Sequence, residues 1–194
     1  MNKLPEIIGL AGTNGAGKDT LGDLRFILHN ARKVSLSDIL RAEADKRGLA
    51  HERIHLSAIS TELSTKLGAG ALAVATIQNF QDTRTYGETG LSIVSIRRPY
   101  EGRAIQDAGG TLIWIDANRE LRYQRILEAN RGRVTDIKTF EEFCVEEDRE
   151  MHPESDDPFV LNMAGVRDIS DIHLLNEFGS KDEFEADLVD RFSL

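Results

Sequence analysis

A short glycine-rich segment, residues 12–18, most constrains what this chain can fold into. It reads GTNGAGK, follows the apolar stretch PEIIGLA at 5–11, and precedes a helical pattern over 17–30. In this context glycines let backbone N–H groups turn inward around phosphate oxygens, and the start of the helix adds a positive dipole. The segment predicts a phosphate-binding loop made of Gly12, Thr13, Asn14, Gly15, Ala16, Gly17, Lys18, Asp19 and Thr20.

The residue after the lysine departs from the usual form of such a loop. Ser or Thr normally stands there and its hydroxyl binds magnesium, whereas this chain has Asp19 and then Thr20. We expect Thr20 to supply the hydroxyl from one position further on. For Asp19 two roles remain open: it holds magnesium through water, or it stabilises the first turn of its helix through the dipole.

The rest of the chain alternates between strand-like and helix-like patterns. Strands are predicted at 5–11, 33–36, 91–96, 111–117 and 172–178. Helices are predicted at 17–30, from Asp38 as N-cap to Gly48, and at 51–67, 70–84, 100–108, 119–129, 139–151, 159–168 and 180 onward. Thr139 with Glu142 predicts a capping box at the start of the helix at 139–151, and Ser180 with Glu183 is expected to cap the last helix. The apolar face expected for the first helix consists of Leu21, Leu24, Phe26 and Ile27. The alternation predicts an α/β fold, a parallel sheet covered by helices on both faces.

Composition excludes several classes of protein. With 194 residues, 40% of them hydrophobic, the chain fits one domain spanning 1–194. The formal net charge of −9 argues against a general nucleic-acid binder. The single cysteine, Cys144, cannot form an internal disulfide, and we find neither a leader pattern nor an apolar run of about 18 residues. We expect a cytoplasmic protein with no membrane and no nucleic-acid partner; the oligomeric state is not indicated.

Arginines concentrate where ligands bind in parallel sheets. The chain has 17 arginines against 7 lysines. Arg97 and Arg98 follow the strand at 91–96, and ligands of α/β sheets bind at the carboxyl ends of strands. Guanidinium groups suit phosphate geometry, so we expect Arg125, Arg131 and Arg133, around the NRGR turn, to contact phosphate. Arg119 and Arg122 are expected to be ordinary solvated helix residues.

These motifs, in this order, resemble those of the P-loop nucleoside monophosphate kinases. The likeness is to archaeal adenylate-kinase-like proteins and, more distantly, to dephospho-CoA kinases. The matching segments are GTNGAGKDT, SDILRAEADKRG, IRRPYE, RYQRILEANRGR and LLNEFGSKDEFEADL. The resemblance implies a three-layer α/β/α P-loop kinase fold with a five-stranded parallel sheet, acceptor-binding helices at about 38–85 and a lid at about 126–157.

The resemblance also implies an activity and roles for particular residues. The expected reaction is ATP- and Mg²⁺-dependent phosphorylation of a nucleoside or deoxynucleoside monophosphate. Lys18 and the loop amides would hold the ATP phosphates, and Arg41 and Arg97 would grip the acceptor phosphate. Arg125, Arg131 and Arg133 would stabilise the transferred phosphoryl group. The expected magnesium residues are Thr20, Asp38 and Asp19.

Three alternatives stay open beside that expectation. The family often has Asp-Gly where this chain has Val94 and Ser95, which favours an ATP-binding regulatory module with weak ATPase activity. A dephospho-CoA kinase would need a base for its hydroxyl acceptor, and Asp38 is the best-placed candidate. A remote alternative is a zinc hydrolase through His51, Glu52 and His55, which read H-E-x-x-H, although the intervening Arg53 opposes a bound cation.

Overall fold

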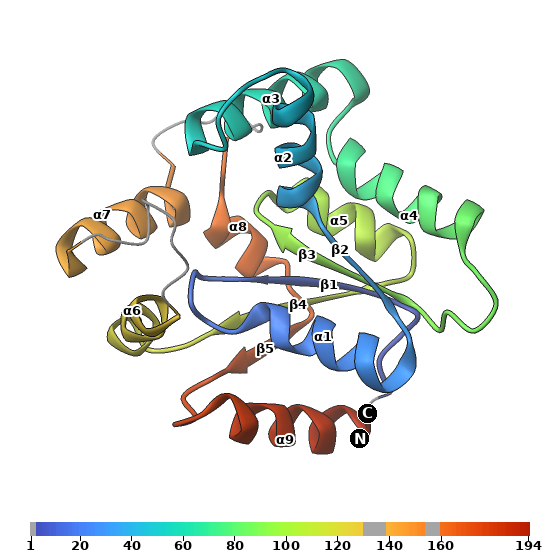
Figure 1. Ribbon diagram of the computed structural model, residues 1–194, viewed down its shortest axis with the longest axis vertical. Helices are drawn as coiled ribbons and strands as arrows, with labels where there is room; N and C mark the ends of the chain where they lie inside the picture. Colours follow the sequence, from blue (N-terminus) through green and yellow to red (C-terminus); the bar gives the residue numbers. More distant parts are fainter. Residues whose placement is uncertain (1–2, 130–138, 154–159) are drawn as a thin grey trace.

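The computed structural model describes residues 3–129, 139–153 and 160–194, and its centre is a parallel five-stranded sheet. The strand order is β2-β3-β1-β4-β5, so β1 lies between β3 and β4 (Figure 1). The strands are β1 (Ile7–Gly12), β2 (Arg32–Ser35), β3 (Leu91–Ile96), β4 (Thr111–Asp116) and β5 (Ile172–Leu175). The predicted parallel sheet is therefore confirmed, with strand ends differing by one or a few residues.

Helices cover both faces of the sheet. Those on one face are α1 (Lys18–His29) and α9 (Lys181–Phe192). The opposite face carries α4 (Ala71–Thr83), α5 (Pro99–Asp107) and α8 (Met163–Asp168). The remaining helices are α2 (Leu36–Lys46), α3 (Arg53–Leu67), α6 (Arg119–Glu128) and α7 (Phe140–Met151). Figure 1 shows α2 and α3 beyond one end of the sheet and α6 and α7 beside the ends of β1 and β4.

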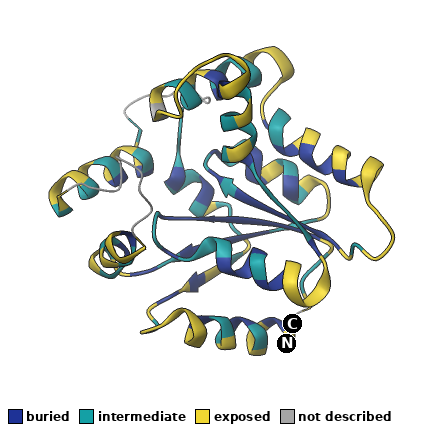
Figure 2. Ribbon diagram, in the orientation of Figure 1, coloured by how far each residue is buried: buried dark blue, intermediate teal, exposed yellow. Residues whose placement is uncertain are grey.

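Side chains that alternate along the strands build two apolar cores. Ile8 and Leu10 of β1 face α1 and α9, whereas Ile7 and Ala11 face α5 and α8. All four side chains are buried, and β1 is dark along its whole length in Figure 2. Apolar residues on both faces of each strand are typical of a parallel sheet with two helical layers.

The β3 strand departs from this alternation at one position. Leu10 of β1 pairs with Val94, but the next residue, Ala11, pairs with Ile96. Ser95 is the additional residue, and its φ of 66° lies in the left-handed region. Ile96 consequently packs in the same core as Ile93, three positions earlier.

Two expectations about helix ends and faces are wrong. Asp38 is not an N-cap; the hydroxyl of Ser35 accepts from the backbone N–H of Asp38, so Ser35 is the N-cap and α2 begins at Leu36. Phe26 and Ile27 do not belong to the buried face of α1; they are 56% and 72% exposed. The capping boxes predicted from Thr139 and Ser180 are present at the starts of α7 and α9.

Arg25 of α1 joins the amino ends of two strands. It is buried, and its guanidinium donates to the carbonyls of Pro5, Glu6 and Leu91 at 3.0–3.2 Å and to the Ser92 hydroxyl at 3.1 Å. Burial lowers the pKa of Arg25 to about 10. Arg25 thus links the amino ends of β1 and β3, at the end of the sheet away from the glycine-rich loop.

None of the helices among the described residues combines the length and the apolar character that crossing a membrane requires.

We expect Arg25→Met to lower the free energy of unfolding by about 2 kcal/mol or more, because the buried acceptors lose their donors. Urea unfolding at pH 7 measures this loss. Arg191→Met is the matched control: Arg191 forms an exposed pair with Asp187 within α9, and its loss should cost no more than about 0.5 kcal/mol. Equal losses in the two variants would contradict the role given to Arg25.

Candidate functional site

The glycine-rich loop connects the end of β1 to the start of α1, as predicted. Gly12, Gly15 and Gly17 have φ values of 147°, 80° and 86°, which side-chain-bearing residues rarely adopt. A Cβ on Gly12 would lie 2.0 Å from the carbonyl oxygen of Ile115, so the loop leaves β1 in direct contact with β4. Helix α1 begins directly after the loop, at Lys18, so the backbone N–H groups of its first turn lie next to the loop.

The loop is also tied to the end of β4. The hydroxyl of Thr13 donates to Oδ1 of Asp116 at 2.6 Å, and the same oxygen accepts from the backbone N–H of Ala117 at 2.8 Å. Nε of Arg122 lies 3.4 Å from this oxygen. Asp116 thereby fixes the first turn of the loop against the strand beside it.

Two side chains hold backbone carbonyls of the loop. Arg122 of α6 donates to the carbonyl of Asn14 at 3.2 Å. Asn176, which follows β5, donates from Nδ2 to the carbonyl of Ala16 at 2.9 Å. Both side chains are buried. The conformation of the loop is thus fixed from both neighbouring elements.

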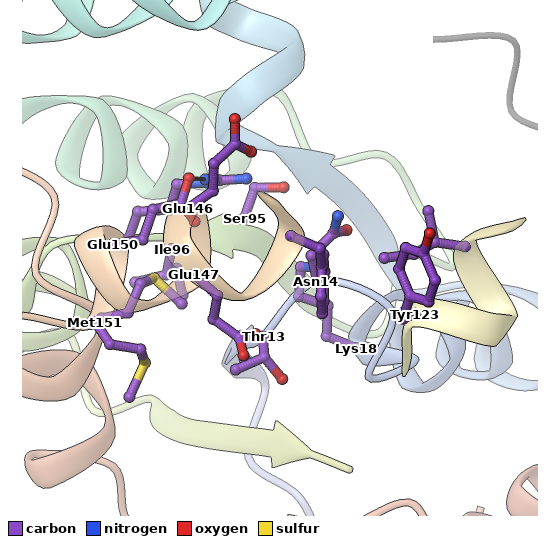
Figure 3. A pocket seen from close by; sticks show the side chains of 15 residues that line it. Thr13, Asn14, Lys18, Ser95, Ile96, Tyr123, Glu146, Glu147, Glu150 and Met151 are labelled. Carbon is purple, nitrogen blue, oxygen red and sulfur yellow. Dashed lines mark hydrogen bonds and ion pairs between the residues drawn. The ribbon is translucent and has the colours of Figure 1, made fainter. Parts of the chain in front are cut away.

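A solvent-open cavity lies beside the loop, with about 770 Å³ of empty space when the adjoining solvent is included. It is lined by Gly12, Thr13, Asn14, Lys18, Ser95, Ile96, Arg97, Tyr123, Ile126, Phe143, Glu146, Glu147, Glu150, Met151 and Met163. Figure 3 shows Lys18, Asn14 and Thr13 together on the loop, with Tyr123 beyond them on α6. The loop and the Lys18 side chain at its base suit a phosphate-bearing small molecule.

Helix α7 contributes three glutamates to the cavity wall, and arginines form ion pairs with two of them, Glu147 and Glu150. Glu147 binds Arg122 with both oxygens, one of them at 2.8 Å, and Arg119 at 2.7 Å. Glu150 accepts from Nη1 of Arg97 at 3.1 Å. In Figure 3 Glu147 extends from α7 to the side of Thr13, whereas Glu146 and Glu150 lie nearer Ser95.

Comparison with known proteins assigns the chain to a family. No protein-family model matches it. The UPF0200 protein of Pyrobaculum aerophilum is 30% identical over 187 residues, which cover 94% of each chain. The chain belongs to the UPF0200 family. The UPF0200 protein of Thermococcus sibiricus is a further relative, 28% identical over 88% of this chain and 86% of its own.

Solved structures show the fold of this UPF0200 chain. TT1252 from Thermus thermophilus superposes with a TM-score of 0.56 and 18% identity, covering 99% of both chains. Shikimate kinase from Bacteroides thetaiotaomicron gives a TM-score of 0.55 and 14% identity, covering 97% of this chain and 98% of its own. With the parallel five-stranded sheet between helices, these neighbours confirm the three-layer P-loop kinase fold.

The arginines expected at the acceptor phosphate occupy different surroundings in the UPF0200 chain. Arg97 lines the cavity and is paired with Glu150. Arg41 lies outside the cavity lining and binds Asp38, one turn earlier on α2. Arg98 is buried and donates to the Ser60 hydroxyl on α3 at 2.7 Å, with Glu101 at 3.6 Å. Burial raises the pKa of Glu101, although the hydrogen bonds that its carboxylate accepts from the backbone N–H groups of Arg97 and Arg98 act in the opposite direction.

The arginines of α6 divide differently from the expectation. Arg122, expected to be solvated, is 3% exposed and is part of the loop's support, while Arg119 is only partly exposed and is held by Glu147 and Asp148. Arg125 donates to Oδ1 of Asn176 at 3.2 Å and to the carbonyl of Phe178 at 2.9 Å. Burial lowers the pKa of Arg125. Arg131, Arg133 and much of the predicted lid lie outside the described residues.

The magnesium candidates are separated in space. Thr20 is buried in the first turn of α1. Asp19 instead faces Lys33 of β2 at 3.5 Å, and Lys33 also binds Asp23 at 2.7 Å. Asp38 is engaged by Arg41. The described ranges contain no group of three or more His, Cys, Asp or Glu residues able to hold a metal ion.

The H-E-x-x-H interpretation fails on its helical premise. Helix α3 begins at Arg53, so His51 lies before it and does not share a helical face with His55. Nε2 of His51 lies 2.6 Å from Asp45, and Nδ1 of His55 lies 3.0 Å from the carbonyl of Ala50. The two imidazoles are therefore engaged with different partners.

Proposed function

We propose that this UPF0200 protein is an ATP-dependent phosphotransferase that transfers the γ-phosphoryl group to a nucleoside or deoxynucleoside monophosphate. The observation that carries the proposal is the pinned glycine-rich loop with Lys18, which opens into a cavity that also contains Arg97. Positioned positive charge and backbone amides are what phosphoryl transfer requires of a protein. The phosphate acceptor is already ionised, so the reaction needs no general base.

The proposed reaction uses this chain's residues in the following way. Loop amides and Lys18 hold the β- and γ-phosphates of the donor. An oxygen of the acceptor phosphate bonds to the γ-phosphorus as the bond to the β,γ-bridging oxygen breaks, which leaves ADP. Arg97 orients the acceptor after leaving Glu150. Arg41 and Arg125 would join these groups only by exchanging their present partners, Asp38 and Asn176.

Magnesium would neutralise charge on the donor phosphates, and Thr20 is the residue of this chain best suited to hold it. Thr20 lies in the first turn of the helix that follows the loop. A hydroxyl is the group that phosphate loops offer to magnesium. The ion pair of Asp19 with Lys33 supports the helix-end role for Asp19.

Lys18→Ala should reduce turnover about 100-fold or more, because it removes a cation that stabilises the transferred charge. The measurement is ADP release with a panel of ribo- and deoxynucleoside monophosphates and with dephospho-CoA. Lys181→Ala is the control, since that lysine pairs with Glu185 on α9, and it should behave as wild type. Tight ATP binding without turnover on any acceptor would replace the kinase proposal with the regulatory module.

Asp19→Asn and Thr20→Val should differ in their magnesium dependence. We expect Asp19→Asn to leave the magnesium concentration for half-maximal turnover unchanged, because this carboxylate faces Lys33. Thr20→Val keeps the shape of the side chain but removes the hydroxyl, and should raise that concentration about tenfold. A magnesium titration of both variants checks the assignment. A raised requirement in Asp19→Asn alone would give the metal to Asp19.

A hydroxyl-bearing acceptor, as in dephospho-CoA, is the second candidate, and the carboxylates of α7 favour it. Glu146 and Glu150 line the cavity, where a carboxylate could take the proton of an attacking hydroxyl. Asp38, the base expected from the sequence, is bound to Arg41 and lies outside the cavity lining. The two acceptor classes therefore assign Glu150 different roles: a general base for a hydroxyl acceptor, or only the ion-pair partner of Arg97 for a phosphate acceptor.

Glu150→Gln distinguishes the two acceptor classes. For a monophosphate acceptor we expect KM for the acceptor to fall several-fold with little change in kcat, because a negative charge competing for Arg97 is removed. Steady-state kinetics over pH 6–9, beside Glu141→Gln on the exposed face of α7, measure both constants. A collapse of kcat in Glu150→Gln, with loss of the acidic limb of the pH profile, would instead identify a hydroxyl acceptor.

A further inference from the structure

Arg122 connects the glycine-rich loop to α7 through a buried network. Its side chain is 4% exposed, that of Glu147 is 9% exposed, and the two groups bind each other through two hydrogen bonds. The guanidinium also donates to the carbonyls of Ala117 at 2.8 Å and Asn14 at 3.2 Å, and lies 5.7 Å from the ring centre of Phe143. A single side chain thus touches β4's end, the loop and α7.

The contact with Asn14 determines which way the next amide points. A trans peptide is planar, so its C=O and the following N–H point in opposite directions, and the described chain contains no cis peptide. Arg122 holds the carbonyl of Asn14 on the α6 side, and the N–H of Gly15 must therefore face away from α6. Gly15 itself packs against α6 closely: a Cβ there would lie 2.6 Å from the carbonyl oxygen of Arg122.

Asn176 has the same effect two residues later. It holds the carbonyl of Ala16 and thereby directs the N–H of Gly17 away from itself. Alternate peptides of the loop are consequently fixed by outside donors, while their glycines have the positive φ values that this arrangement requires. The donors act on carbonyls, so they leave the amides of Gly15 and Gly17 available to an anion.

We infer that Arg122 and Glu147 are positioning residues that couple the docking of α7 to nucleotide binding in the loop. Glu147 fixes the guanidinium, with Arg119 binding the same carboxylate from its partly exposed side. The guanidinium fixes the carbonyl of Asn14 and, with it, the amide of Gly15. This inference rests on the proposed function, because it assumes that the loop binds nucleotide phosphates. By thermodynamic reciprocity, nucleotide binding must then stabilise α7 in its docked position.

The decisive comparison uses Arg122→Met and the double variant Arg122→Met/Glu147→Met. The single variant leaves Glu147 buried without its partner and should lower the melting temperature. The double variant replaces the ion pair with apolar side chains of similar size and should regain much of that loss. ADP affinity, measured by calorimetry, should remain about tenfold weaker in both, because neither can hold Asn14. Recovery of wild-type affinity in the double variant would overturn the inference.

Controls separate positioning from general damage to α7. Glu141 lies on the exposed side of α7, so Glu141→Gln should leave the ADP affinity and the melting temperature at their wild-type values. Arg122→Lys keeps the charge but not the paired donors, so its ADP affinity should also fall. Wild-type ADP affinity in Arg122→Lys would show that the positive charge alone suffices and would overturn the positioning role.

Hydrogen exchange in the wild-type protein tests the coupling without any substitution. Saturating ADP should increase the protection of amides in 140–151. Helix α4 packs against α5 and contributes no residue to the cavity lining, so it serves as the internal reference. Unchanged exchange in α7 despite bound ADP would overturn the coupling and leave the proposed function intact. Failure of the wild-type protein to bind ADP or ATP would instead overturn the proposed function.

Discussion

Pairing of β1 with both β3 and β4 is the constraint on which the rest of the structure depends. Because all the strands are parallel, Gly12, Ile96 and Asp116 end at one edge of the sheet. The loop then turns within contact of Ile115, which only a residue without a Cβ allows at position 12. Lys18 and Arg97, the residue that follows β3, both reach the cavity at that edge because of the strand order rather than because of local sequence.

Arginine has two distinct uses in this acidic protein. Arg97 faces the cavity, where a phosphate could replace its carboxylate partner. Arg25, Arg98 and Arg122 are buried, and each joins segments distant in sequence by donating to carbonyls or hydroxyls. The fork of donors in a guanidinium suits this second use, since one side chain can satisfy several buried acceptors. Abundance of arginine is therefore a weaker signal for phosphate binding than its location.

The sequence predicted what local chemistry determines and missed what packing determines. The loop, the strands and both capping boxes follow from residues within a few positions of one another, and the structure has them. The expectation for Arg122 is wrong because its partner Glu147 lies 25 positions away, on a helix whose packing no local pattern predicts. The expectation for Phe26 and Ile27 is wrong because helical periodicity predicts an apolar face but not where the elements that cover it end. The expectation that His51 lies on a helix with His55 is wrong because α3 begins two residues after His51.

The extra residue at Ser95 determines to which face of the sheet the side chains of the next residues, Ile96 and Arg97, point. In a regular strand, side chains alternate, so Ile96 would point to the α1 face and the next residue to the opposite one. The insertion inverts this parity: Ile96 joins the core on the α5 side, and the chain emerges with Arg97 on the cavity wall. Ser95 holds a left-handed backbone to achieve this, at a cost of about 1 kcal/mol. If Ser95 instead took its place in the regular alternation, every motif would keep its order in the sequence, and yet Arg97 would point away from the cavity.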